Sequence, residues 1–137
     1  MAEKPIAVDE ALIEKVIRQF YQTVMKDDLI GPIFNEKIKD WEPHLQKMFA
    51  FWSAVMLQTR RYDGRPMPKH VFLPIDAQHF DRWLKLFEQT VQSHCTPHDA
   101  SLFVYKAKHI AKSLEMGVAQ KNNVFLKLDE RYNAKDS

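Results

Sequence analysis

The chain has 137 residues, the length of one domain, and its composition excludes several classes of protein. The formal net charge is only +2 and the charges are interspersed, so nothing predicts a nucleic-acid-binding surface. No apolar run approaches the ~18 residues of a membrane span, and the N-terminus has no apolar stretch typical of a secretory signal. Cys95 is the single cysteine, which excludes an internal disulfide and fits a reducing cytoplasm.

The first half of the chain predicts two long amphipathic helices. Asp9 is a plausible N-cap for a helix whose apolar residues recur three and four positions apart, at Ile13, Val16, Ile17, Phe20, Tyr21 and Val24. Gly31 and Pro32 are predicted to break the helical pattern. A second long helix is expected after Asp40 and should run to about residue 59. Pro43 is tolerated in its first turn, where a backbone N–H has no helical partner.

The second half predicts two more helices after an irregular connection over residues 60–75. The third long helix should begin at Asp76, and its apolar stripe is Phe80, Trp83, Leu84, Phe87 and Val91. The fourth should begin with Thr96 as N-cap and Pro97 at the first helical position. Its apolar stripe is Phe103, Ala107, Ile110, Ala111 and Leu114.

Residues 1–137 are therefore expected to form one all-α domain. Only three glycines occur, so few tight turns are available, and helices with short connections are favoured over a sheet sandwich. From about residue 120 the sequence becomes polar, which predicts a frayed C-terminal tail. Three apolar residues within this tail, Val124, Phe125 and Leu126, indicate either a contact with another molecule or a tail folded back on the domain.

Two histidines and two polar aromatic residues suggest a cofactor site. His44 shares one helical face with the apolar residues Met48, Phe51, Trp52 and Val55. His70 lies in the segment 66–74, which three prolines stiffen, and a histidine on a stiff loop suits an axial ligand of haem iron. Tyr21 and Trp83 lie on apolar stripes of other helices. Together they suggest a flat, apolar, metal-bearing cofactor inside a helical shell, since no zinc or nucleotide motif is present.

Each of these residues, taken singly, also has an ordinary explanation. Amphipathic helices can pack on one another without a ligand, with Trp83 in the core and the Tyr21 hydroxyl on a backbone carbonyl. The chain would then be a haem-free helical interaction module. That alternative does not explain why His70 is held on a proline-stiffened loop. His79 and His109 fit partly solvated helix faces and are less informative.

From about Ile13 to Gly117 the chain resembles the truncated haemoglobins, and within them the group III branch. The resemblance rests on FY at 20–21, LIGPIFN at 29–35, WEPH at 41–44, FW at 51–52, YDG at 62–64, KH at 69–70, LP at 73–74, Phe80 and WLKLFE at 83–88. The glycine pairs typical of groups I and II are absent. The resemblance implies a two-over-two helical sandwich around haem b.

The resemblance also implies roles for individual residues. By position, His70 looks like the proximal iron ligand, and Tyr21, His44 and Trp83 look like the distal residues. Lys47 and Lys69 stand where related proteins often place a partner for a haem propionate, and Arg65 and Tyr62 compete for that role. The remaining cofactor contacts that the resemblance implies are Phe34, which would pack on the haem plane, together with Met48, Phe51, Trp52, Phe72 and Phe80.

The ligands expected from the resemblance are dioxygen, nitric oxide, carbon monoxide or peroxide. The Tyr21 hydroxyl and the Trp83 indole N–H are both donors, and two hydrogen bonds to a partly negative ligand would slow its loss by roughly 10²-fold or more. Such retention favours nitric oxide or peroxide chemistry over oxygen transport. His44 would be a gate or an acid–base group. No flavin or nicotinamide site is visible, so an external reductase is expected. A gas sensor acting through a partner protein is the remaining alternative.

Overall fold

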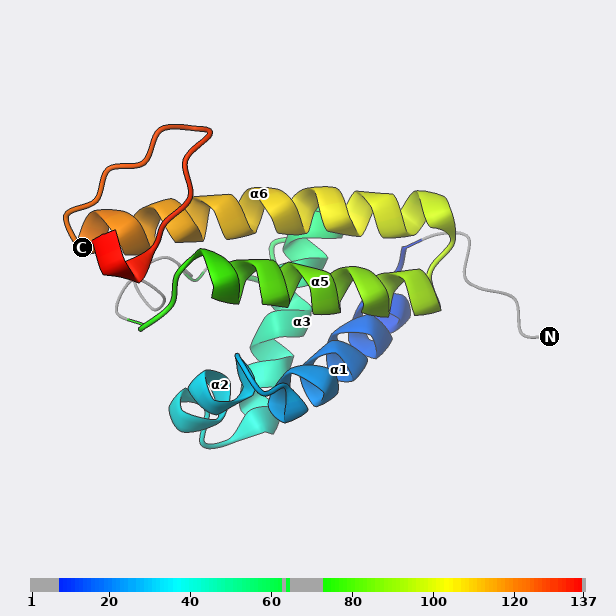
Figure 1. Ribbon diagram of the computed structural model, residues 1–137. Helices are drawn as coiled ribbons and strands as arrows, with labels where there is room; N and C mark the ends of the chain where they lie inside the picture. Colours follow the sequence, from blue (N-terminus) through cyan, green and yellow to red (C-terminus); the bar gives the residue numbers. More distant parts are fainter. Residues whose placement is uncertain (1–7, 63, 65–72, 137) are drawn as a thin grey trace.

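The computed structural model describes residues 8–62, 64 and 73–136, and the regular structure within them is helical throughout (Figure 1). The helices are α1 (Glu10–Lys26), α2 (Gly31–Lys37), α3 (Trp41–Leu57), α5 (Ala77–His94), α6 (Pro97–Lys121) and the 3₁₀ helix η1 (Ala134–Asp136). The described ranges contain no strand, which confirms the all-α prediction. None of the described helices is long and apolar enough to cross a membrane.

The helices form two pairs that lie across one another. α5 and α6 run antiparallel, side by side, while α1 crosses α5 and packs on α3 (Figure 1). α3 also reaches α6, so the α1–α3 pair covers one side of the α5–α6 pair. This is the two-over-two arrangement that the family resemblance implies. The largest fully buried side chains between the pairs are Phe20, Phe87, Phe103, Ile13, Ile17 and Val16.

Local capping explains where the long helices begin. The Asp9 side chain accepts a hydrogen bond of 2.8 Å from the Leu12 N–H at the start of α1. Thr96 does the same for the Asp99 N–H at the start of α6, with Pro97 in the first turn. The three N-caps predicted for α1, α5 and α6 are confirmed, since Asp76 caps α5. α3 begins at Trp41 with Pro43 in its first turn, also as predicted.

The turn between α1 and α2 differs from the expectation. The helical pattern ends at Lys26, but Gly31 and Pro32 themselves begin α2, because proline needs no N–H partner in a first turn. A Cβ at Gly31 would lie 2.9 Å from the Val24 carbonyl oxygen, so only glycine fits there. Burial opposes the ionisation of Asp27, yet hydrogen bonds from the Ile30 N–H, from Arg82 and from the Leu29 N–H hold its pKa below the ordinary value.

The C-terminal segment is attached to the helices, and the prediction of a tail that frays from about residue 120 is wrong for residues 124–134. Tyr132 is 2 % exposed, and its carbonyl accepts a hydrogen bond of 2.8 Å from the Ala77 N–H. Val124 and Leu126 pack against a second apolar cluster with Phe80 and Tyr132, whereas Phe125 remains exposed. Of the two alternatives for these apolar residues, the structure therefore supports the folded-back tail.

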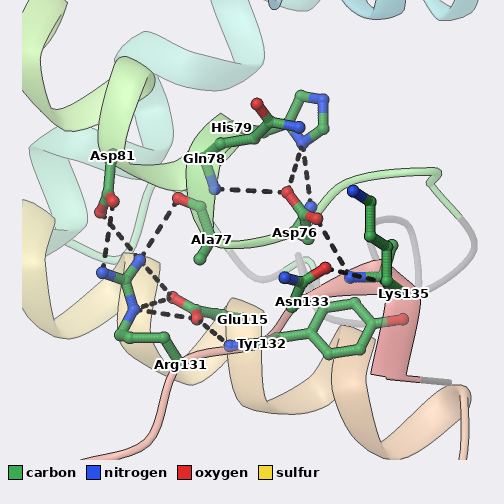
Figure 2. A network of polar contacts seen from close by, with 11 residues as sticks. Asp76, Ala77, Gln78, His79, Asp81, Glu115, Arg131, Tyr132, Asn133 and Lys135 are labelled. Atoms are coloured by element: carbon green, nitrogen blue, oxygen red, sulfur yellow. Dashed lines mark hydrogen bonds and ion pairs between the residues drawn. The ribbon is translucent and has the colours of Figure 1, made fainter.

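Polar contacts hold this segment in place, as Figure 2 shows. The Arg131 guanidinium donates to both carboxylate oxygens of Glu115, at 3.0–3.1 Å, and to Asp81 at 2.8 Å. Glu115 is buried and also accepts a hydrogen bond of 2.8 Å from the Tyr132 N–H. We call these four residues, Asp81, Glu115, Arg131 and Tyr132, the tail latch. The prediction of a frayed tail failed because a polar composition does not reveal that Arg131 and the Tyr132 N–H bind the buried carboxylate of Glu115.

Candidate functional site

One cavity of about 360 Å³ lies between the two helix pairs. Its walls come from α1, α2, α3, α5 and α6 and from the residues just before α5. Its lining is mainly apolar, and the lining residues are Tyr21, Ile30, Ile33, Phe34, Lys37, Ile38, His44, Lys47, Met48, Phe51, Trp52, Tyr62, Leu73, Ile75, His79, Phe80, Trp83, Ile110, Ala111 and Leu114. A volume of this size falls within the ~300–1,000 Å³ that small-molecule and cofactor sites occupy.

The structure brings together every predicted site residue that it describes. The distal candidates Tyr21, His44 and Trp83 all line the cavity. So do the six described cofactor contacts, Phe34, Lys47, Met48, Phe51, Trp52 and Phe80. The predicted iron ligand His70 lies outside the described residues, as do Lys69, Phe72 and Arg65. The structure thus places these nine side chains around one cavity. The roles given to them stay predictions.

Tyr21 is a buried residue of the cavity wall that carries a polar group. Its side chain is 5 % exposed, and its ring meets Phe34 and His44 edge to face, with centroids 5.9 Å and 5.6 Å away. Within the described residues its hydroxyl makes no hydrogen bond, whereas the alternative interpretation gave it a backbone carbonyl as partner. Burial raises the pKa of this phenol well above its ordinary value. Tyr21 therefore presents a neutral O–H donor.

Trp83 is held in place by two aromatic neighbours. Its ring stacks on Phe87, with centroids 5.6 Å apart and planes 4° apart, and meets Phe20 edge to face at 5.6 Å. These contacts come from α5 itself and from α1, so the indole is fixed where the two helix pairs cross. An indole carries a donor and no acceptor, and Trp83 thus adds an N–H donor to the cavity wall.

His44 lies in the first turn of α3, beside Tyr21. The imidazole meets Tyr21 at 5.6 Å and Trp41 at 5.8 Å, in both cases edge to face. Pro43 precedes it without displacing it from the cavity wall. The helix start therefore places a titratable ring next to the buried phenol, as the helical spacing predicted.

Sequence reasoning missed a second group of lining residues. Lys37 and three apolar neighbours, Ile30, Ile33 and Ile38, reach the cavity through α2 and its ends, which were not predicted as helical. His79 is partly exposed, as expected, and it also lines the cavity, which was not predicted. The stripe of α6 did carry a signal, because Ile110, Ala111 and Leu114 were predicted core positions and form part of the wall.

The charges around the cavity have one sign. Among the described lining residues none is acidic, whereas Lys37 and Lys47 are both basic and are largely exposed at its edge. An apolar interior with cationic groups at the rim suits a flat hydrophobic ligand that carries negative groups on its periphery.

Comparison with known proteins agrees with this geometry. A family model described as bacterial-like globin matches residues 6–123. The group 3 truncated hemoglobin of Campylobacter jejuni is 32 % identical over 113 residues, which cover 79 % of this chain and 89 % of that protein. The crystal structure of a group III truncated hemoglobin from Campylobacter jejuni superposes with a TM-score of 0.77 at 30 % identity, covering 90 % of this chain and 96 % of the other.

A more distant structure shares the fold alone. A mutant of the group II truncated hemoglobin from Bacillus anthracis superposes with a TM-score of 0.59 at 19 % identity, and the match covers 94 % of this chain and 99 % of that one. The helix pairs, the cavity between them and the extent of these matches lead to one conclusion. The chain belongs to the bacterial-like globins and, among them, to the group III truncated haemoglobins.

Proposed function

We propose that this protein binds haem b in the cavity and retains small ligands there for nitric oxide or peroxide chemistry rather than for oxygen transport. The observation that carries the proposal is the placement of two hydrogen-bond donors, Tyr21 and Trp83, in the wall of one largely apolar cavity within a globin fold. A carrier must release its ligand readily, and two converging donors oppose release.

The residues around the cavity fit a haem. The walls offer aromatic and aliphatic side chains to a flat macrocycle, and the rim offers lysines but, in its described part, no carboxylate. Lys47 and Lys37, which both line the cavity, would pair with the propionates. Phe34, Phe80 and Met48 would contact the ring, while His70 would hold the iron. When bound, haem b supplies an iron atom that takes up a small ligand and exchanges electrons with it.

Tyr21 and Trp83 would act on the ligand through their donors. A ligand with partial negative charge accepts hydrogen bonds that contribute about 1.5–3 kcal/mol each. Two such bonds would slow dissociation by roughly 10²-fold or more, because ~1.4 kcal/mol corresponds to a factor of ten. Since the pKa of Tyr21 is raised, its hydroxyl stays protonated and keeps donating at neutral pH.

His44 would control access or protons at the same place. Its ring touches that of Tyr21, so a rotation of His44 would change the space beside the phenol. With an ordinary pKa near ~6.5, an imidazole can also take up and return a proton during peroxide chemistry. Sustained turnover needs electrons that the chain does not supply, so an external reductase would deliver them. We place both proteins in the cytoplasm.

The test is the absorption spectrum of the purified protein, reconstituted with haemin, before and after addition of dithionite and carbon monoxide. A Soret band that shifts on reduction and again with carbon monoxide supports the proposal. A protein that stays colourless after haemin is offered contradicts it and leaves a haem-free interaction module.

A histidine substitution tests the proximal assignment. His70→Ala should lose tight haem binding, because the iron loses its protein ligand. His109→Ala is the matched control, since His109 lies on the exposed face of α6 beside Tyr105 and does not line the cavity. Equal haem retention and identical spectra in the two variants would refute the assignment of His70.

A further inference from the structure

We infer that His79 is a cofactor-binding residue, which donates a hydrogen bond from Nε2 to a peripheral carboxylate of the bound tetrapyrrole. The inference rests on the proposed haem binding and extends it to a residue that neither the sequence pattern nor the family resemblance indicated. His79 lines the cavity, and its side chain is 15 % exposed. It therefore lies at the edge of the cavity, where a charged periphery can meet both protein and water.

The cap of α5 fixes which nitrogen of His79 carries a hydrogen. Nδ1 lies 2.9 Å from the Asp76 N–H and accepts its hydrogen bond, as the third residue of a capping box does. The same Nδ1 lies 3.2 Å from Asp76 Oδ1, to which it donates when the ring is protonated, whereas a neutral ring with its hydrogen on Nδ1 would leave the Asp76 N–H without its capping partner. Nε2 consequently bears the hydrogen in the neutral ring, and it also does so in the protonated ring.

Nε2 is directed away from the cap. Figure 2 shows Nδ1 facing Asp76 and the other ring nitrogen on the opposite side of the imidazole. Within the described residues Nε2 has no hydrogen-bond partner, although His79 is more buried than exposed. A donor at the edge of an apolar cavity, with its ring orientation set by the backbone, is suited to an anionic acceptor of the ligand.

The C-terminal segment also helps to fix the orientation of the His79 ring, because it binds Asp76. One carboxylate oxygen of Asp76 accepts a hydrogen bond from the Gln78 N–H at 3.3 Å, and the other accepts one from the Ala134 N–H at 3.0 Å. Asp76 is 8 % exposed, so these bonds are largely shielded from water. The residue that holds His79 is thus itself held by both α5 and the tail, which keeps the imidazole in one orientation before a ligand arrives.

The experiment compares two substitutions that differ at the cavity but not at the cap. Glutamate and glutamine are both ordinary third residues of a capping box, so His79→Glu and His79→Gln each preserve the start of α5. Glutamine retains an N–H donor for the carboxylate of the porphyrin, whereas the negative charge of glutamate repels that carboxylate. Each variant is titrated with haemin and with haemin dimethyl ester, which has no free carboxylate, and haem transfer to an acceptor globin gives the dissociation rate.

We expect His79→Glu to bind haemin about tenfold more weakly than the wild type and to bind the dimethyl ester equally well, a change equivalent to ~1.4 kcal/mol. His79→Gln should stay near the wild type with both. His109→Glu, which introduces the same charge away from the cavity, should change neither affinity. Thermal unfolding of the haem-free variants verifies that the cap is intact.

The outcomes separate this inference from the proposed function. If His79→Glu binds both porphyrins as the wild type does, the hydrogen bond to the carboxylate is disproved while haem binding stands. If it loses affinity for both equally, the free carboxylate of haemin plays no part in the effect, and the hydrogen bond from His79 is likewise disproved. If the wild type binds neither porphyrin, the proposed function fails and this inference fails with it.

Discussion

Tyr21 shows how one buried residue sets ligand retention. Its phenol keeps its proton because burial raises its pKa, and its side chain lines the cavity. We predict that Tyr21→Phe increases the dissociation rate of dioxygen at least tenfold, since phenylalanine preserves the ring packing and removes one hydrogen bond. Stopped-flow displacement by carbon monoxide measures the rate.

The pH dependence of the dioxygen dissociation rate tests whether the Tyr21 hydroxyl stays protonated. An acid whose pKa is raised remains protonated to higher pH, so the wild-type rate should not vary with ionisation of Tyr21 between about pH 6 and pH 9. Tyr105→Phe is the control, because Tyr105 is 60 % exposed and does not line the cavity. An unchanged rate in Tyr21→Phe would remove Tyr21 from this role.

The residues of the site could be predicted only where they lie on the apolar stripe of a helix. Tyr21, His44 and Trp83 lie on apolar helical stripes, so their periodicity places them in the interior, and the family resemblance then suggests their role. The role proposed for His79 was not predictable from its spacing, since the orientation of its ring comes from a backbone hydrogen bond with Asp76. Lys37 depends on a helix that was not predicted. Contacts of this kind become visible only with coordinates.

At the level of the elements, the tail latch joins the C-terminal segment to the two helices that carry Phe80, His79 and Leu114. We predict that Arg131→Ala lowers the free energy of unfolding by about 2 kcal/mol, because buried Glu115 loses its charged donor and keeps only the Tyr132 N–H. Urea unfolding of the haem-free protein measures the change.

Two further variants make that prediction specific. Arg18→Ala removes an ion pair with Glu42 in which the side chains are 36 % and 57 % exposed, and it should cost at most ~1 kcal/mol. Glu115→Gln combined with Arg131→Ala should cost less than Arg131→Ala alone, since no unpaired buried charge remains. If Arg131→Ala costs no more than Arg18→Ala, the latch does not stabilise the fold.

The four long helices were predictable because caps and stripes are local signals. Asp9, Asp76 and Thr96 all cap the helices that they were predicted to begin. The tail was not predictable, because Arg131 meets Glu115 across 16 positions and Asp81 across 50 positions of the sequence. Such pairs leave no periodic pattern in a polar segment, so composition alone suggested fraying.

The whole molecule encloses a cavity of about 360 Å³ between two pairs of helices. Its walls include large side chains from both pairs, such as Phe34, Phe51 and Phe80. In the haem-free protein these side chains lack the contacts that a bound macrocycle would supply, and dispersion contacts of this kind are individually small but numerous. The α1–α3 and α5–α6 pairs should therefore be held together more firmly when the cavity is filled.

We predict that saturating haemin raises the midpoint of thermal unfolding by on the order of 10 °C, because a ligand present at ~1,000 times its Kd stabilises the native state by ~4 kcal/mol. Calorimetry or far-UV circular dichroism with and without haemin measures the shift. His70→Ala should show a much smaller shift at the same haemin concentration, while His109→Ala should match the wild type. An equal shift in both variants would mean that haemin stabilises the fold without an iron ligand from residue 70. No shift in the wild type would mean that the cavity does not bind haemin.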